Sequence, residues 1–269
     1  MKALTFFPSQ PEVQYKMDEY IEQRPLNRLI GRDIALYYQF KTQEDSINPF
    51  ALIPDGCFDL LFCCCPKKPS IFLWTSPLER REQQLSFQKG CEYFGVRFQP
   101  EQGLLKINCS MRDLLGKKIP LDDIMSVDPF LMEKILKGNS FTERIHLFEL
   151  FIKGISPQSQ SQNIVGYCIN QIYLANGNIS INDLTVDTGY SDRYIRKKFE
   201  ESIGFSPKQF SEIVRFQNSL AMIFEKNHHN LADIVYENGY YDQAHFIKGF
   251  KKFVHLAPTQ FIGSLYQQS

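Results

Sequence analysis

The alternation of apolar and polar positions changes character about halfway along the chain. In the first hundred residues, short β-branched and aromatic runs recur between turn signals, a pattern typical of strands. The runs are Ile34–Phe40, Phe50–Ile53, Phe58–Cys65, Ile71–Thr75, Leu85–Gln88 and Tyr93–Phe98. Six short strands at this spacing predict a small β-barrel or sandwich. From Gln102 to Lys153 the spacing becomes helical, most clearly over Phe141–Ile152.

The second half of the chain has helical spacing throughout. The predicted helices cover residues 164–175, 181–187, 192–202, 207–225, 231–237, 242–253 and 258–266. Ser191 and Asp242 stand where a helix N-cap is wanted, and Pro207 and Pro258 stand in a first turn. Between the two halves, the segment SPQSQSQN (156–163) has no apolar side chain and predicts a flexible linker. We therefore expect two domains: a mainly β, jelly-roll-like barrel with a helical tail over 1–155, and an all-α domain over 164–269.

An internal repeat organises the all-α half. The pattern Asp183-Leu184-x4-Gly189-Tyr190 recurs fifty residues later as Asp233-Ile234-x4-Gly239-Tyr240. One inserted residue then shifts the offset to 51. At that offset Ile195 matches Phe246, Lys197 matches Lys248, Phe199 matches Phe250, Pro207 matches Pro258, and Phe210 matches Phe261.

Each copy has the form of a helix-turn-helix. A short helix ends at a glycine that can take the left-handed conformation of a tight turn, and a second helix follows at once. The second helix is two-faced in both copies. One face carries Ile195, Phe199 and Ser202 in the first copy, or Phe246, Phe250 and Phe253 in the second, and the other face is mostly polar. A solvated face is the ordinary explanation for one such helix, but its recurrence after the same turn favours a common binding role.

The charge balance agrees with this interpretation only when the positions of the charges are considered. The whole chain has 30 Lys and Arg against 30 Asp and Glu, so its formal net charge is zero. Most cations of the second half nevertheless fall in two short segments, at 193–198 and 248–252. Clustered cations in a neutral domain are compatible with a nucleic-acid partner.

With these motifs in place, the segment from about Asn163 to Gln267 resembles the DNA-binding domain of AraC/XylS-family regulators. The matching residues are Gly189-Tyr190-Ser191, Ile195, Phe199, Gly204, Ser206-Pro207 and Phe210 in the first unit, and Gly239-Tyr240-Tyr241-Asp242, Phe246, Phe250-Lys251-Lys252, Pro258 and Phe261 in the second. Arg215 would lie in the connecting helix. The chain departs from the family pattern at Thr185 and Val235, where alanine is usual, and at His255, where glycine is usual.

The resemblance implies which side chains would face DNA. The base-contacting positions would be Arg193, Arg196 and Lys197 in the first unit, and Gln243, Ala244, His245, Ile247 and Lys248 in the second. Arginine can bind guanine in a bidentate manner, glutamine can pair with adenine, and an apolar side chain can contact a thymine methyl. Phosphates would be contacted by Ser191, Lys198, Lys251 and Lys252. The two units should enter successive major grooves about 34 Å apart.

For the N-terminal half, the resemblance implies a cupin-like barrel that senses an effector or dimerises. The segments Ile53–Leu60 and Tyr93–Pro100 resemble parts of one subgroup of the family. We therefore expect a transcription regulator with double-stranded DNA and RNA polymerase as partners, and with a small-molecule effector or a second copy bound through the barrel. The alternative is a constitutive, ligand-free regulator whose barrel only dimerises. The short apolar run at the start does not suit a signal peptide, so a cytoplasmic location is expected.

An enzyme is the rival class, and the sequence gives it little support. His146 is the one histidine before residue 162, which argues against a histidine-bound metal in the barrel. Asp55 and Asp59 form a candidate carboxylate pair, but Asp55 in Pro-Asp-Gly is typical of a turn. No phosphate-binding or nucleophile-elbow motif occurs. We predict no catalytic residue, no metal and no cofactor, and we expect the single tryptophan, Trp74, to pack in the core.

The seven cysteines leave one question open. On a strand, Cys57, Cys63 and Cys65 would share one face, and Cys64 would point the other way. Buried free thiols are the expected state of this run. A redox or metal-sensing cluster is the alternative, although nothing outside the run supplies further ligands at zinc-like spacing.

Overall fold

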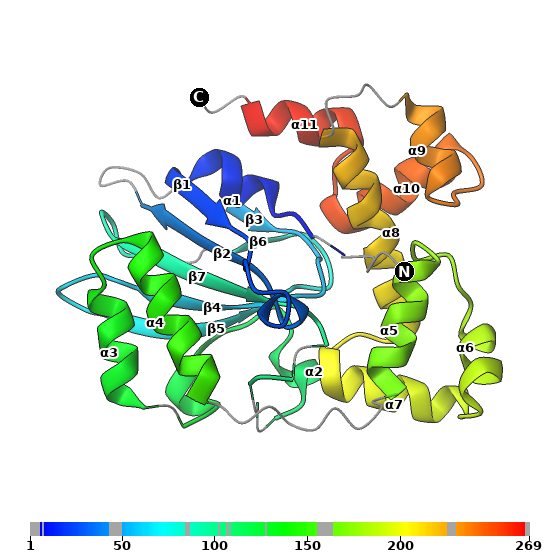
Figure 1. Cartoon of the computed structure of the whole chain (residues 1–269). Coiled ribbons are helices and arrows are strands. Elements are labelled where there is room, and N and C mark those ends of the chain that lie inside the picture. The colour runs from blue at the N-terminus through cyan, green and yellow to red at the C-terminus, as the bar shows by residue number, and fades with distance from the viewer. Residues whose placement is uncertain are drawn as a thin grey trace.

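The computed structural model describes residues 6, 8–42, 50–83, 87–101, 103–105, 107, 109–126, 128–154, 164–224 and 230–266. An antiparallel sheet with helices against it forms the N-terminal part, and a helical part follows (Figure 1). The predicted linker, 156–163, lies outside the described residues. Within the described part of the chain, no helix is both long and apolar enough to cross a membrane.

Six strands make up the main sheet. Their order across the sheet is β1 (Asp18–Gln23), β2 (Ile34–Lys41), β7 (Glu92–Phe98), β4 (Phe58–Cys63), β5 (Ser70–Thr75) and β8 (Lys118–Pro120). A separate two-stranded sheet pairs β3 (Phe50–Leu52) with β6 (Arg81–Gln83). Every neighbouring pair is antiparallel. The mainly β N-terminal domain that the sequence predicts is therefore present.

Three strands differ from the prediction because their sequences carry no apolar alternation. The predicted strand Leu85–Gln88 is wrong at Phe87 and Gln88, which lie outside any strand, while 85 and 86 are outside the described residues. The strand in this region is β6, with the polar sequence REQ. β1 and β8 were also missed, and both lie at an edge of the main sheet, where few side chains need to be buried.

The sheet is buried on both faces, and successive side chains serve different cores. Phe58, Leu60 and Phe62 of β4 belong to a cluster that includes Phe148, whereas Leu61 and Cys63 belong to another. The first cluster is covered by α3 (Pro129–Lys137) and α4 (Phe141–Gly154), and α1 (Pro11–Lys16) packs near β3 on the other side (Figure 1). As predicted, Trp74 is a core residue, with 1% of its surface exposed.

The helices of the C-terminal part match their predicted ranges to within one residue. They are α5 (Ile164–Leu174), α6 (Ile181–Thr188), α7 (Asp192–Ile203), α8 (Pro207–Phe224), α9 (Leu231–Glu237), α10 (Gln243–Val254) and α11 (Pro258–Tyr266). The two predicted N-caps are confirmed. The Ser191 side chain accepts the backbone N–H of Tyr194, and the Asp242 side chain accepts that of His245.

The two parts pack against each other along α8. Gln217 on α8 is 2% exposed; its Oε1 accepts the Ser9 N–H at 2.9 Å, and its Nε2 donates to the Pro54 carbonyl at 2.8 Å. Next to Pro54, Gly56 has a φ of +76° and lies against the ring of Phe210. Asp55 is the turn residue that the sequence predicts, since its Oδ1 accepts the Cys57 N–H at 2.9 Å.

Candidate nucleic-acid interface

The first helix-turn-helix unit consists of α6 and α7. A capping box fixes the start of α6, because the side chains of Ser180 and Asp183 each accept the other's backbone N–H. The helix ends at Gly189, whose φ of +72° is left-handed and whose N–H donates to the Thr185 carbonyl. The chain then enters α7 at once, and α7 packs through Ile195 and other apolar side chains.

The second unit, α9 and α10, repeats this construction. Asn230 and Asp233 form the same capping box. Past the end of α9, Gly239 has a φ of +65°, and the Tyr240 N–H donates to the Val235 carbonyl at 3.0 Å. The duplication found in the sequence is thus a structural duplication: the first helix of each unit starts at the same capping box and is followed by a left-handed glycine, although the C-cap of α9 is Asn238, one residue before Gly239.

α8 connects the two units and packs on both second helices. The ring of Phe210 lies 6.2 Å from that of Phe199 on α7, and the ring of Phe216 lies 5.3 Å from that of Phe250 on α10. All four side chains are fully buried. Because the same helix makes both contacts, the packing of α7 and α10 on α8 sets the position of the two units relative to each other. We call α7 and α10 the reading helices.

The departures from the family pattern leave the backbone path intact. His255 ends α10 with a φ of +62°, the left-handed conformation that Gly204 has at the end of α7. Thr185 donates its hydroxyl to the Asn182 carbonyl at 2.7 Å, and Val235 is buried. One assignment was wrong: Ser202, expected on the apolar face of α7, is exposed, and the next residue, Ile203, is buried instead.

On the first reading helix, most of the predicted DNA-contacting cations are engaged within the helix. Arg196 donates from Nε to Asp192 four residues earlier. Lys197 and Lys198 both lie near Glu201, at 3.8 and 3.1 Å, and this contact raises the pKa of Lys198. Arg193 is exposed and has no carboxylate partner within the described part of the chain. The face therefore carries one unengaged guanidinium and three cations that would exchange partners on binding.

The second reading helix presents a less charged face. Gln243, Ala244, His245 and Lys248 are exposed, and Ile247 is half-buried. The imidazole of His245 accepts the Tyr241 N–H at its Nδ1, 3.2 Å away. Two predicted phosphate contacts, Lys251 and Lys252, lie in the last turn of α10, and Lys252 forms an ion pair with Glu212 on α8.

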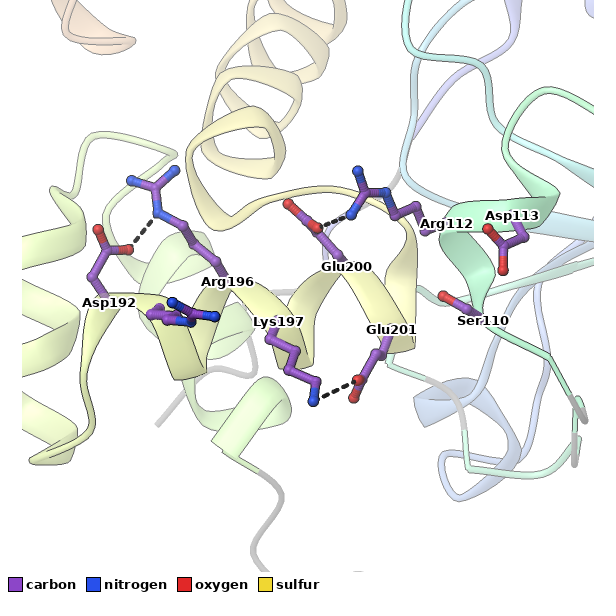
Figure 2. Close-up of a pocket in the computed structure, with 9 residues that line it drawn as sticks. Ser110, Arg112, Asp113, Asp192, Arg196, Lys197, Glu200 and Glu201 are labelled. Atoms are coloured by element: carbon purple, nitrogen blue, oxygen red, sulfur yellow. Dashed lines mark hydrogen bonds and ion pairs between the residues drawn. The ribbon is translucent and has the colours of Figure 1, made fainter.

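One neighbour of the first reading helix was not predicted from the sequence. This is α2 (Met111–Leu114), a helix of only four residues from the N-terminal domain. Arg112 donates to Glu200 of α7 at 2.7 Å, and Leu115 lies against Gly204. A groove separates the two elements (Figure 2), and its walls are formed by Ser110, Arg112, Asp113, Asp192, Arg193, Arg196, Lys197, Glu200 and Glu201. The predicted base-contacting cations thus line the same groove as α2, toward the N-terminal end of α7, while α2 lies beside Glu200 near the other end (Figure 2).

The C-terminal part thus has the architecture of a DNA-binding module with two helix-turn-helix units on one connecting helix. Residues 184–264 match the family described as "Helix-turn-helix domain". The segment is an AraC-type helix-turn-helix domain, and the resemblance found in the sequence is confirmed for it.

Relatives of this segment are also regulators by name. It is 29% identical over 85 residues to an uncharacterized HTH-type transcriptional regulator of Staphylococcus aureus (strain MSSA476). The aligned region covers 32% of this chain and 11% of that protein. It is 38% identical over 63 residues to an uncharacterized HTH-type transcriptional regulator of Haemophilus influenzae, which covers 23% of this chain and 21% of that protein. The chain therefore spans only a small part of the length of these relatives.

Among solved structures, ToxT from Vibrio cholerae O395 aligns over 86% of this chain and 98% of its own, with 13% identity and a TM-score of 0.41.

Proposed function

We propose that the protein is a sequence-specific DNA-binding transcription regulator. The observation that carries this proposal is the tandem repeat of the unit, in which each reading helix buries one face against α8 and exposes the other. Names of the relatives support it, since they are HTH-type transcriptional regulators. The proposal places the protein with double-stranded DNA and RNA polymerase in the cytoplasm, and it assigns no catalysis, metal or cofactor to the chain.

The two reading helices would divide the work of recognition. In the first, Arg193 is available at once to a guanine edge, and Arg196 would exchange Asp192 for a base. In the second, Gln243 would pair with a base edge, while Ala244 and Ile247 would offer apolar contacts. Phosphates would be bound by Ser191, the N-cap of α7, and by Lys198, Lys251 and Lys252. Such contacts fix the register of the protein on DNA without reading its sequence.

Substituting one cation of each kind tests this division. We expect Arg196→Ala to reduce the preference for the cognate site over a scrambled duplex by about 1–3 kcal/mol. Lys251→Ala should weaken binding to both duplexes equally and lower the slope of log K against log salt by about one. The measurement is fluorescence anisotropy over a salt series, on a site selected from random duplexes by the full chain.

Lys137→Ala is the matched control, because Lys137 is an exposed lysine of α3 in the N-terminal domain. It should leave both affinity and slope unchanged. Equal, sequence-blind losses from the Arg196 and Lys251 variants would contradict the base-reading role of Arg196. If the wild-type chain enriches no duplex from the random pool, the proposed function itself is wrong.

We further propose that the N-terminal domain controls DNA binding through the contact between α2 and α7. The groove described above has α2 at one end and Arg193, Arg196 and Lys197 along its wall, so α2 lies at the edge of the surface that DNA would approach. An effector or a second copy that displaced the N-terminal domain would therefore expose the reading helix. Such a displacement would also have to break the polar link through Gln217 and open the apolar cluster that Phe6 and Ile53 share with the C-terminal helices.

Arg112→Met gives this second proposal a distinctive sign. Loss of a cation beside the DNA-facing groove should weaken DNA binding if only long-range charge matters. If the Arg112–Glu200 pair holds α7 in a restrained state, the same change should instead strengthen binding, by about 1.4- to 5-fold for an exposed pair worth about 0.2–1 kcal/mol. Affinity is measured on the full chain at fixed salt. An unchanged or weakened affinity would reject control through this contact.

A further inference from the structure

Two cysteines far apart in the sequence lie opposite each other at one end of the main sheet. β4 and β7 pair antiparallel, with Phe62 opposite Phe94 and Cys63 opposite Tyr93. Just past this pair, the Cys64 N–H donates to the Glu92 carbonyl at 2.9 Å. Cys65 and Cys91 are the next residues of the two chain segments, and both belong to the same buried cluster as Cys63 and Tyr93. Cys91 lies far from the run Cys63–Cys65 in the sequence and comes close to it only in the fold.

The type of pairing suits a covalent bond between these two residues. Extended by two residues past Cys63 and Tyr93, the same register brings Cys65 and Cys91 to a non-hydrogen-bonded position. In such a pair the Cα atoms are about 4.5 Å apart, and both side chains lie on the same face of the sheet. A disulfide needs a Cα separation of about 4.4–6.8 Å. A register of this kind therefore suits a cross-strand disulfide between the two residues.

Their surroundings distinguish the two thiols chemically. The pKa of Cys65 is lowered, first by a hydrogen bond from the Cys91 thiol and then by the backbone N–H groups of Lys67 and Lys68. Burial raises the pKa of Cys91, and its contact with Cys65 raises it further. Of the two thiols, Cys65 is thus the one that loses its proton more readily, with the Cys91 thiol beside it. Cys65 stands next to the exposed turn that contains the two lysines, with 8% of its surface exposed.

The other cysteines nearby are placed differently. Cys63 is fully buried and lies opposite Tyr93; its side chain also contacts the Cys91 thiol, but less strongly than Cys65 does. Cys64 is half-buried and packs against the core on the opposite face of the sheet. Among the described residues, no three His, Cys, Asp or Glu side chains are arranged to hold a metal ion. The local geometry therefore favours a dithiol pair over a metal site.

We propose that Cys65 and Cys91 are a reversible redox pair that a hydroperoxide converts into a cross-strand disulfide. In the first step the Cys65 sulfur attacks the peroxide; one oxygen is transferred to give a sulfenic acid, and the other leaves as water or alcohol. In the second step the Cys91 sulfur displaces the hydroxyl group of the sulfenic acid, and the second water leaves with the thiol proton. The two thiols lose two electrons and two protons in total, and the peroxide is reduced. A dithiol reductant reverses the bond by exchange.

The proposal is tested on the reduced full chain, treated with hydrogen peroxide, alkylated, and digested for mass spectrometry. We expect a peptide pair joined through Cys65 and Cys91, with a mass 2 Da below the sum of the two peptides, and its disappearance after dithiothreitol. Cys63→Ser and Cys109→Ser should keep this product. Cys91→Ser should abolish it and let a sulfenic acid at Cys65 accumulate, trapped by dimedone.

Several outcomes would overturn the proposal. One is a disulfide that joins Cys65 to a cysteine other than Cys91. Another is oxidation of the exposed Cys109 while Cys65 and Cys91 stay reduced. A third is a zinc ion that the wild-type chain binds and dithiothreitol removes, and that Cys91→Ser does not bind. The wild-type measurement needs no variant to fold, and circular dichroism checks the serine variants. The result does not depend on whether the chain binds DNA, so the two proposals stand or fall separately.

Discussion

Arg97→Met should lower the free energy of unfolding by about 3–5 kcal/mol at neutral pH, because it leaves two carboxylates in the core without their cation. The Arg97 guanidinium binds both oxygens of Asp59, at 3.0 and 3.3 Å, and one of its nitrogens lies 3.8 Å from Asp55. All three side chains are buried. Burial lowers the pKa of Arg97, but the two carboxylates outweigh this and the pKa is raised, so the arginine stays charged.

The loss of unfolding free energy caused by Arg97→Met should also depend on pH. Burial raises the pKa of Asp59 to about 6, and Arg97 opposes that rise. Without Arg97 the pKa rises further above its unfolded value of about 3.9. The folded variant then binds more protons than the unfolded chain between these values, so its stability falls as pH rises through them. The loss relative to wild type should therefore be larger at pH 8 than at pH 5.

Urea titrations at both pH values measure these differences. Arg112→Met is the matched control, since Arg112 also pairs with a glutamate but is 67% exposed, and it should change stability by less than about 1 kcal/mol. An Arg97 variant that matched the Arg112 variant at both pH values would show that the buried ion cluster contributes no net stability.

Gly177→Ala should destabilise the DNA-binding domain more than any other single methyl addition at its turns. Gly177 has a φ of +76°, which already costs a residue with a Cβ about 1–2 kcal/mol. The new Cβ would also overlap the backbone oxygen of Ser211 and lie 2.9 Å from the backbone nitrogen of Arg215, both on α8. Backbone atoms inside a helix cannot move aside as a side chain can, so we expect a total loss of about 3–5 kcal/mol.

Gly189→Ala separates the two contributions. Gly189 has a similar φ of +72°, but nothing lies within 4 Å of the position its Cβ would take. This variant should lose only the conformational cost of about 1–2 kcal/mol. Thermal and urea unfolding of the two variants give the difference. Equal losses would show that the close approach of Gly177 to α8 contributes nothing.

The same comparison shows where sequence reasoning succeeds and where it stops. Gly189 was identified because it lies between two helical patterns and recurs in the repeat as Gly239. Gly177 gives a similar local signal in Asn-Gly, yet its importance comes from α8, more than thirty residues later. Arg215 lies in that connecting helix as expected, and it donates to the Gly177 carbonyl at 3.0 Å. Local patterns predict elements well, whereas the distance between elements depends on packing.

The candidate DNA-binding site likewise has a part that local sequence patterns predict and a part that depends on packing. The positions on α7 and α10 could be assigned because capping and amphipathic signals place them, whereas α2 is too short to have a period, and its contact with Glu200 joins residues 88 apart. The pairing of Asp59 with Arg97 and of Cys65 with Cys91 was equally hidden. Both strands were predicted, but neither pattern gives the register that brings these residues together.

The apolar cluster beneath α8 includes Phe6 and Ile53 from the N-terminal part together with the helices of the C-terminal part. Phe6 stacks on Tyr173 at 4.9 Å between ring centroids. A core shared in this way couples the melting of the two parts, so they should unfold in one cooperative transition rather than in two. Each half then stabilises the folded state of the other. A ligand that binds and stabilises the sheet should therefore also raise the melting temperature of the helices that would contact DNA.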